Sequence, residues 1–331
     1  MTKIEHIWVA LENENSNYSG LLYKRYSAGI VPDVYIAIKF PEKLRCIALK
    51  IGVSFSFEEN QWNKLKDIKI ETLPDDGDVS KKFLLILLLN KQHKDIFSTL
   101  CEDLIFGISE VSTEQNLVET LLERLEKWQS LFEKVGRQGL SDESQRGLYG
   151  EIYFLRFFLN NSSEINKCVK SWLGPEKAIQ DFQYANWAVE VKTTHGNNHQ
   201  KIHITSERQL DDSIIDKIFL FHLSLDIRVG NGETLNTLID AVSELLIENT
   251  IASNLFKLKL LECGYFDIHK SLYEEKGYTI RQENIYRVSG AFPRIIENQI
   301  PTGVGDVKYS IILSESEEWR ISHETLLGEL K

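Results

Sequence analysis

The stretch Gln180-Asp-Phe-Gln-Tyr-Ala-Asn-Trp-Ala-Val-Glu-Val-Lys-Thr-Thr194 determines how the rest of the chain is interpreted. Its second half, Trp187–Thr193, predicts a β-strand. Because side chains alternate between the two faces of a strand, the two valines point into a core. Glu190 and Lys192 then lie on the opposite face, next to Ala188. The stretch therefore predicts a strand that is buried on one face and charged on the other.

An acid, Asp181, precedes this strand. We expect Asp181 and Phe182 to form a short strand or bend, and the segment Gln183–Asn186 is long enough for the chain to turn back toward Glu190. Two carboxylates and one ammonium group at one strand end would cost free energy if they had only a structural role, because like charges repel and buried charges need partners. A divalent cation such as Mg²⁺ resolves the conflict through oxygen ligands. Lys192 then orients a water or stabilises charge on a phosphate.

A further acid, Glu151, lies in a predicted helix that is capped by Ser141 or Asp142 and continues to about Leu159. At about 100° per residue, Glu151 falls within the apolar arc of this helix. An acid is rare at such a position. Two interpretations remain open. Glu151 pairs with a buried arginine or lysine, or it supplies another metal or water ligand.

The chain resembles the PD-(D/E)xK nuclease superfamily, whose members share the restriction-endonuclease-like fold. Asp181, Glu190 and Lys192 carry the resemblance, with Val191 at the variable position. One departure is Gln180, which stands where the motif has proline. Two upstream motifs narrow the resemblance to a bacterial branch known as the PD-(D/E)xK motif family. They are Gly147-Leu-Tyr-Gly150-Glu151 in the helix and Trp172-Leu-Gly174-Pro175 in a loop expected over Lys167–Pro175.

The resemblance implies roles for individual residues. The catalytic residues would be Asp181, Glu190, Lys192 and Glu151. The metal ligands would be Asp181, Glu190, Glu151 and the main-chain carbonyl of Val191. The cofactor would be Mg²⁺, for which Mn²⁺ would substitute, and the substrate would be DNA.

The residues after the site strand are candidates for contacts with the substrate. Lys201–Thr205 predicts the next strand, antiparallel to the site strand, and Ser206–Leu210 predicts the start of a helix. In related nucleases a glutamine early in this helix faces the site, which makes Gln209 a candidate. A surface amide is the other interpretation. Lys201 and Arg208 are further candidate substrate contacts.

The chain of 331 residues is long enough for one large domain or two of ordinary size. We predict an accessory domain over residues 1–137, of α/β or mostly β character. It would end in a long helix, Ser112–Val135, with Ser112 and Gln115 as a capping box. Glycines behind this helix mark the boundary. The nuclease-like domain would span residues 138–331 and include a C-terminal extension.

The order of the predicted elements indicates an α/β fold with a restriction-endonuclease-like core, in which helices flank a mixed sheet. In the accessory domain, Val34–Phe40 and Arg45–Ile51 predict a hairpin, and Lys82–Leu89 predicts a buried strand or a buried helix. In the second domain, Lys217–Leu225 predicts a central strand and Thr234–Glu248 an amphipathic helix. Later strands are expected at Tyr278–Arg281, Ile285–Ser289 and Lys308–Leu313.

The net charge of −11 argues against a general nucleic-acid binder, because phosphate contacts need a basic surface. The charge is unevenly distributed. Ser144–Leu210 contains eight Lys or Arg and six Asp or Glu, so this segment is +2 and the remainder is −13. We therefore expect weak unaided DNA binding, with a partner protein supplying affinity. The chain has no apolar run of transmembrane length and no signal-peptide pattern, so we expect a cytoplasmic protein without a membrane partner.

Two functions of different classes follow. The first is a Mg²⁺-dependent DNA endonuclease that acts as an effector subunit of a bacterial restriction or anti-phage system. The resemblance implies this role, together with ATPase or other defence subunits as partners and a homodimer as one assembly. The alternative is a catalytically silent DNA- or protein-binding scaffold with a relict nuclease fold. A third interpretation treats Asp181, Glu190 and Lys192 as a structural ion-pair network in an unrelated α/β protein.

Overall fold

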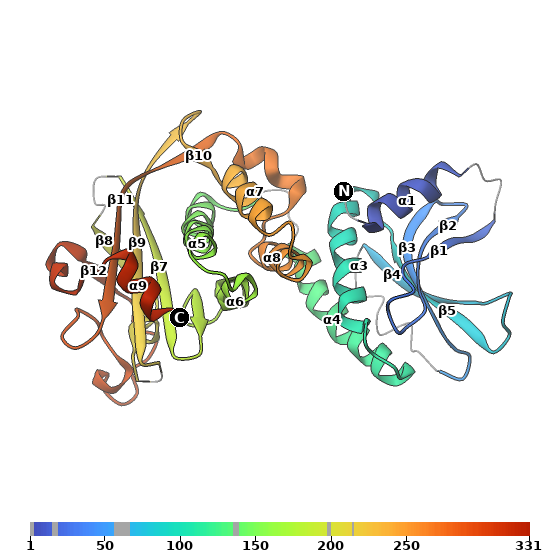
Figure 1. The fold of residues 1–331 in the computed structure, drawn as a ribbon, viewed down its shortest axis with the longest axis horizontal. Coiled ribbons are helices and arrows are strands. Elements are labelled where there is room, and N and C mark those ends of the chain that lie inside the picture. The colour runs from blue at the N-terminus through green and yellow to red at the C-terminus, as the bar shows by residue number, and fades with distance from the viewer. Residues whose placement is uncertain (1–2, 15–18, 56–66, 135–138, 197–199, 214) are drawn as a thin grey trace. The chain divides into compact units, whose positions relative to one another are not determined.

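The computed structural model describes residues 3–14, 19–55, 67–134, 139–196, 200–213 and 215–331. The chain divides into two compact units, each with its own sheet (Figure 1). The first unit contains Met1–Arg137 and the short segment Phe266–Ile268, and the second contains Gln138–Tyr265 and His269–Lys331. None of the helices within the described ranges combines the length and the apolar character that crossing a bilayer requires.

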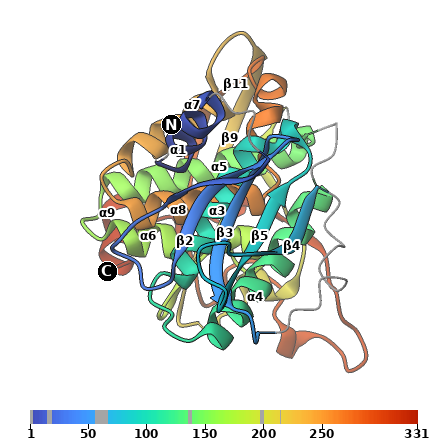
Figure 2. The ribbon, with the colours of Figure 1, turned by 90° about the vertical axis from the view of Figure 1, so that its right-hand side faces the viewer.

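The first unit is built on a five-stranded sheet in which all neighbouring strands are antiparallel. The strands are β1 (Gly20–Arg25), β2 (Val34–Phe40), β3 (Leu44–Gly52), β4 (Ile68–Pro74) and β5 (Lys81–Leu88). Their order in the sheet is β1-β2-β3-β5-β4, and Figure 2 shows β2, β3, β5 and β4 side by side. The middle strands are almost wholly buried, as expected from their continuous apolar runs.

Helices of the first unit pack against this sheet and against one another. They are α1 (Lys3–Asn13), the short 3₁₀ turn η1 (Lys91–His93), α3 (Lys94–Ile108) and α4 (Glu114–Lys134). Trp8 of α1 shows how they are joined. Its indole donates a hydrogen bond to the carbonyl of Ala37 in β2, at 3.0 Å. Its ring stacks on Phe97 of α3 with 5.5 Å between the ring centroids. One buried aromatic side chain thus connects the sheet with two helices.

The predicted hairpin of the first unit is confirmed, because β2 and β3 pair in antiparallel register. The apolar run Lys82–Leu89 forms β5, so the helix interpretation of this run is wrong. The predicted capping box is also wrong. Thr113, rather than Ser112, accepts the main-chain N–H of Asn116, at 3.3 Å. The predicted end of the helix at Val135 and the following Gly136 lie outside the described residues.

The second unit contains a mixed five-stranded sheet in the order β10-β11-β9-β7-β6. The strands are β6 (Phe182–Tyr184), β7 (Trp187–His195), β9 (Lys217–Val229), β10 (Glu233–Thr234) and β11 (Lys276–Val288). β7 and β9 are parallel, whereas the other neighbours are antiparallel. The predicted central strand is confirmed as β9, which lies in the middle of the sheet.

Alternating residues of the central strands feed two hydrophobic cores. Val189 and Phe221 belong to the core on the helical side, whereas Ala188 and Leu220 belong to the core on the opposite face. Figure 1 shows α5 and α7 on one side of the sheet and the β8–β12 pair on the other. The prediction of a mixed α/β sheet flanked by helices is thus confirmed. The helices are α5 (Asp142–Asn160), α6 (Ile165–Ser171), α7 (Leu235–Leu245), α8 (Thr250–Glu262) and α9 (His323–Glu329), and the paired strands are β8 (Lys201–Ile204) and β12 (Tyr309–Ile312).

Short 3₁₀ turns connect several of these elements. The turn η3 is all that forms over the predicted helix start Ser206–Leu210, so no α-helix begins there. The predicted loop Lys167–Pro175 is wrong in its first half, which belongs to α6. That helix is too short for its apolar period to be recognised in the sequence. The turns are η2 (Gly174–Glu176), η3 (Glu207–Leu210), η4 (Asp267–Tyr273), η5 (Glu297–Gln299), η6 (Leu313–Glu315) and η7 (Glu317–Trp319).

Strand pairing differs from the prediction at two places. β8 does not pair with β7 but with β12. β9 pairs along the whole of β7, whereas β6 pairs only with its first three residues, Trp187–Val189. The segments Tyr278–Arg281 and Ile285–Ser289 are not separate strands but parts of the continuous strand β11. A register shift between Ile280 and Gln282 interrupts their pairing with β9. A bulge of this kind inserts one unpaired residue without ending the strand.

Candidate active site

Asp181 is held in place at the start of the β6–β7 hairpin. Its main-chain carbonyl accepts hydrogen bonds from the N–H groups of Leu173 and Gly174, at 2.7 and 2.9 Å. Its Oδ2 accepts the N–H of Val191 in β7, at 2.8 Å. The hairpin folds β6 back onto β7. As a result, Asp181 lies beside the strand residue that directly follows Glu190.

Glu190 and Lys192 lie next to each other on one face of β7. Lys192 Nζ is 2.6 Å from Glu190 Oε1, and the Glu190 side chain is only 1% exposed. The other carboxylate oxygen of Glu190, Oε2, has no hydrogen-bond partner among the described residues. A buried carboxylate oxygen without a partner is costly. This oxygen is therefore a candidate for binding a ligand.

Glu151 reaches the site from α5, which packs on the valine face of β7, and Gly150 makes the approach of the helix possible. A Cβ atom at Gly150 would lie only 2.4 Å from Thr193 Cγ2 and 3.3 Å from Val191 Cγ1. Any larger residue would push α5 away from β7. Glu151 Oε2 accepts a hydrogen bond from the indole Nε1 of Trp172, at 2.7 Å. Within the described ranges Glu151 has no salt bridge, so its partner there is a neutral donor rather than a buried arginine or lysine.

Gly174 brings Glu151 and Asp181 together from the side of the loop. A Cβ atom at Gly174 would lie 2.4 Å from Glu151 Oε2 and 3.3 Å from Asp181 Oδ1. The two carboxylates therefore approach each other across a backbone position that has no side chain. The Trp-x-Gly-Pro motif supplies both the indole that binds Glu151 and the glycine that leaves room for it.

Lys259 of α8 stabilises the loop that carries Trp172 and Gly174. Its side chain is 2% exposed, and Nζ donates hydrogen bonds to the main-chain carbonyl of Trp172 and to Glu176 Oε1, the latter at 2.7 Å. A buried ammonium group needs such partners. Lys259 could not be predicted from the sequence, because nothing in the local pattern of α8 relates it to a loop more than eighty residues earlier.

The site contains more acidic groups than basic ones, and this crowding shifts their pKa values. Burial, reinforced by the charge of Asp181, raises the pKa of Glu151 well above its usual range. The same two causes raise the pKa of Glu190 to about 8. Burial also raises the pKa of Asp181, although Lys192 opposes the shift. Burial alone would lower the pKa of Lys192, but the charges of Glu190 and Asp181 outweigh it and raise that pKa. One ammonium group thus does not compensate for three carboxyl groups.

These four side chains line a cavity of about 500 Å³. Lys201 and Gln209 also line it, as does Val191. Gln209 Oε1 accepts hydrogen bonds from the N–H and the hydroxyl of Thr205, at 3.0 and 3.2 Å. Arg208 is not part of the lining. Its guanidinium is exposed and pairs with Glu297, at 2.9 Å.

Arg146 is a cavity residue that the sequence analysis missed. It lies on α5 five residues before Glu151, about 140° away around the helix, so helical spacing from that acid does not point to it. The Nε atom of Arg146 is buried and has no hydrogen-bond partner among the described residues. Further lining residues are Glu143, Gly147, Thr193, Thr194, His195, Ile202, His203 and Thr205.

The comparison with protein families decides the assignment. The sequence model of one family matches residues 4–314, and its description reads "Putative PD-(D/E)XK family member, (DUF4420)". The chain belongs to this family. Membership confirms the resemblance and, with the mixed sheet described above, the prediction of a PD-(D/E)XK nuclease-like fold. No curated protein matches the chain, and no solved structure matches it.

Nucleases of the PD-(D/E)XK superfamily are generally phosphodiesterases that use Mg²⁺ or a similar divalent metal. In this DUF4420 member, no group of three or more acidic, histidine or cysteine side chains in the described ranges is placed to hold a metal ion as it stands. Asp181 Oδ2, Glu190 Oε1 and Glu151 Oε2 each already interact with a nitrogen. The donor set nevertheless fits a hard cation, because it consists of carboxylates with raised pKa values and includes one oxygen without a partner among the described residues.

Proposed function

We propose that the protein is a metal-dependent DNA endonuclease that hydrolyses phosphodiester bonds at the cavity between α5 and β7. The observation that carries this proposal is the meeting of Asp181, Glu190, Glu151 and Lys192 in one cavity, with a lone ammonium group among three buried carboxyl groups. Perturbed pKa values in a cleft are typical of functional sites. Family membership supports the choice of a nuclease reaction.

Each residue has a role in this proposal. Asp181, Glu190 and Glu151, with the main-chain carbonyl of Val191, would hold Mg²⁺ or Mn²⁺. When bound, the cation lowers the pKa of a water and neutralises charge on the scissile phosphate. Lys192 exchanges its contact with Glu190 for the attacking water or for the phosphate. The remaining cations of the cavity bind the DNA backbone; they are Arg146 and Lys201.

Nicking of supercoiled plasmid with Mg²⁺ or Mn²⁺ tests the proposal. We expect Asp181→Asn and Lys192→Ala to abolish nicking. Two variants outside the cavity serve as matched controls. Asp226→Asn removes an acid that pairs with Arg228, and Lys170→Ala removes an exposed base of α6. Full activity in both site variants would show that the cavity is not the nuclease site.

A silent scaffold is the second candidate function. One observation favours it: within the described ranges, no three acidic, histidine or cysteine side chains are placed to hold a metal ion. Calorimetric titration of Mn²⁺ into the wild-type protein and Asp181→Asn separates the two functions. Binding that is lost in the variant supports the nuclease. Absence of binding both with and without a short duplex supports the scaffold.

The biological setting is part of the same proposal. We place the nuclease in a bacterial restriction or anti-phage system, where an ATPase or another subunit activates it, on the basis of the resemblance alone. The net charge of −11 supports the need for a partner, because it opposes DNA binding. Purification of the tagged protein from cells that contain its neighbouring genes would identify such a subunit. The mass of the purified protein alone in solution would show whether it forms a homodimer.

A further inference from the structure

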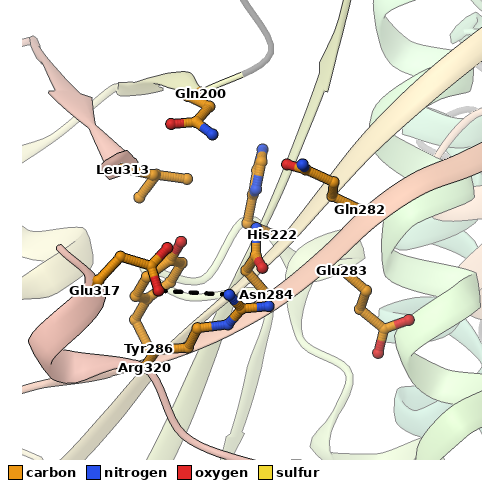
Figure 3. Close-up of a pocket in the computed structure, with 9 residues that line it drawn as sticks. All are labelled: Gln200, His222, Gln282, Glu283, Asn284, Tyr286, Leu313, Glu317 and Arg320. Carbon is orange, nitrogen blue, oxygen red and sulfur yellow. Dashed lines mark hydrogen bonds and ion pairs between the residues drawn. The ribbon is translucent and has the colours of Figure 1, made fainter. Parts of the chain in front are cut away.

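A second cavity, of about 170 Å³, lies on the same face of the sheet as the candidate active site. The strand register establishes the shared face. Lys192 of β7 is the register partner of His222 in β9, and His222 is the partner of Asn284 in β11. Side chains of directly paired residues point to the same face of a sheet. His222 and Asn284 line the second cavity (Figure 3).

The two cavities are separated by one hydrogen-bonded pair. Thr194 lines the candidate active site, and its Oγ1 lies 2.8 Å from Nε2 of His222. Two consecutive residues also connect the cavities, because Lys201 lines the first cavity and its neighbour Gln200 lines the second. A group bound in the second cavity would therefore lie next to a phosphate bound in the first.

The lining of the second cavity fits a neutral ligand with both donors and acceptors. Gln200, Gln282 and Asn284 contribute side-chain amides, each of which donates and accepts. Arg320 is paired with Glu317 at 3.4 Å, so these two charges offset each other. Figure 3 shows this pair at the edge of the cavity.

The other lining residues provide apolar surface or have side chains that point away from the cavity. Leu313 and the ring of Tyr286 provide apolar surface, and both are buried. The Glu283 carboxylate extends away from the other residues in Figure 3 and accepts the hydroxyl of Tyr153, at 2.9 Å. Among the described lining residues, a phosphate would therefore meet no uncompensated lysine or arginine. The volume is close to that of cavities that hold a single aromatic ring, about 150 Å³.

We propose that this cavity binds one nucleobase, turned out of the DNA stack, next to the phosphate that is cleaved. The inference rests on the proposed nuclease function for the identity of the polymer, but base binding is measurable without cleavage. Amides recognise base edges by paired donors and acceptors. Removing a base from the stack costs energy, and a fitted pocket offsets that cost.

The test measures binding of the four free deoxynucleosides by saturation-transfer NMR, on the full-length protein in EDTA. 2-Deoxyribose, which lacks both the base and a phosphate, is the negative probe. Gln282→Trp fills the cavity from an exposed position of β11, and Asn284→Leu removes an amide at similar volume. Thr279→Trp, also exposed on β11 but outside both cavities, is the matched control, and Lys192→Ala reports on the candidate active site.

We expect at least one nucleoside to bind the wild-type protein. Binding should be lost in Gln282→Trp and weakened about tenfold in Asn284→Leu, since paired hydrogen bonds are removed. Thr279→Trp and Lys192→Ala should bind normally. No nucleoside signal in the wild type, an unchanged signal in both cavity variants, or equal binding of 2-deoxyribose would overturn the proposal. Nucleoside binding is measured without metal and does not depend on catalysis. If nucleosides bind but the protein does not nick plasmid in the separate assay with metal, only the proposed catalysis is contradicted.

Discussion

The indole Nε1 of Trp172 donates a 2.7 Å hydrogen bond to Oε2 of Glu151, which links the loop before β6 to helix α5. Trp172→Phe keeps most of the ring but leaves that carboxylate oxygen without its donor. Trp187→Phe is the matched control, because the buried Nε1 of Trp187 has no hydrogen-bond partner among the described residues. We expect the free energy of unfolding, measured with denaturant, to fall by about 1–3 kcal/mol more in Trp172→Phe than in the control. Equal losses would mean that the hydrogen bond does not stabilise the fold.

Gly174→Ala should disturb the candidate metal site more than the fold. Its Cβ would lie 2.4 Å from Glu151 Oε2, so the carboxylate has to move away from Trp172 and Asp181. Displacing the groups around a metal typically lowers affinity about 10–100-fold, and we expect such a loss in Mn²⁺ calorimetry. Gly328→Ala is the control, because a Cβ atom there would meet no other described atom within 4 Å. Unchanged Mn²⁺ affinity in Gly174→Ala would argue against Glu151 as a ligand.

The raised pKa of Glu190, about 8 against an ordinary 4.5, predicts how stability depends on pH. The folded state binds this proton more tightly than the unfolded chain. Its stabilising contribution is complete below pH 4.5 and is lost as the pH rises through 8. We expect the melting temperature in EDTA to decrease across this window, and to decrease less in Glu190→Gln. Glu318→Gln, at an exposed position, should behave like the wild type.

Metal binding should show the opposite pH dependence. A carboxyl group has to lose its proton before it binds a cation, so Mn²⁺ affinity should increase as the pH rises toward 8. Addition of Mn²⁺ should then raise the melting temperature most at the alkaline end of the window. The same Mn²⁺ effect at all pH values would place the ion away from Glu190.

Lys259→Met tests the support beneath the loop that carries Trp172. The substitution keeps the apolar stem but removes the ammonium group that binds the Trp172 carbonyl and Glu176. Because Glu176 is half exposed, we expect a loss of about 1–3 kcal/mol in unfolding free energy, with weaker Mn²⁺ binding. Lys257→Met, two residues earlier on α8, is the control. If both variants bind Mn²⁺ like the wild type, the loop does not depend on Lys259.

Arg146→Ala tests a predicted contact with the DNA backbone. The guanidinium lines the cavity with a buried Nε that has no partner among the described residues, so a phosphate would satisfy it. We expect weaker DNA binding for all sequences, and a slope of log affinity against log salt that is smaller by about one. Fluorescence anisotropy of a labelled duplex in EDTA measures both quantities. Arg281→Ala, at an exposed position of β11, should leave the slope unchanged.

The local features of the site could be predicted from the amino-acid sequence alone. Alternation along the stretch that contains Glu190 and Lys192 predicts the buried and the charged face of β7. The turn after Asp181 could be predicted because the segment Gln183–Asn186 is long enough for the chain to fold back. The acid in the apolar arc of α5 was visible from helical period alone. These features follow from backbone geometry over a few residues, which is the range that sequence patterns describe.

Which distant groups meet became clear only from the folded chain. β8 pairs with β12, a hundred residues later, rather than with the site strand β7 that precedes it. Trp172 binds Glu151, and Lys259 supports Trp172, although no local period connects the three. The cavity beside His222 exists because β7, β9 and β11 align in one register. Hydrogen bonds and burial between distant segments depend on which sheet edges and faces remain free after the chain has folded, and a local pattern does not contain that information.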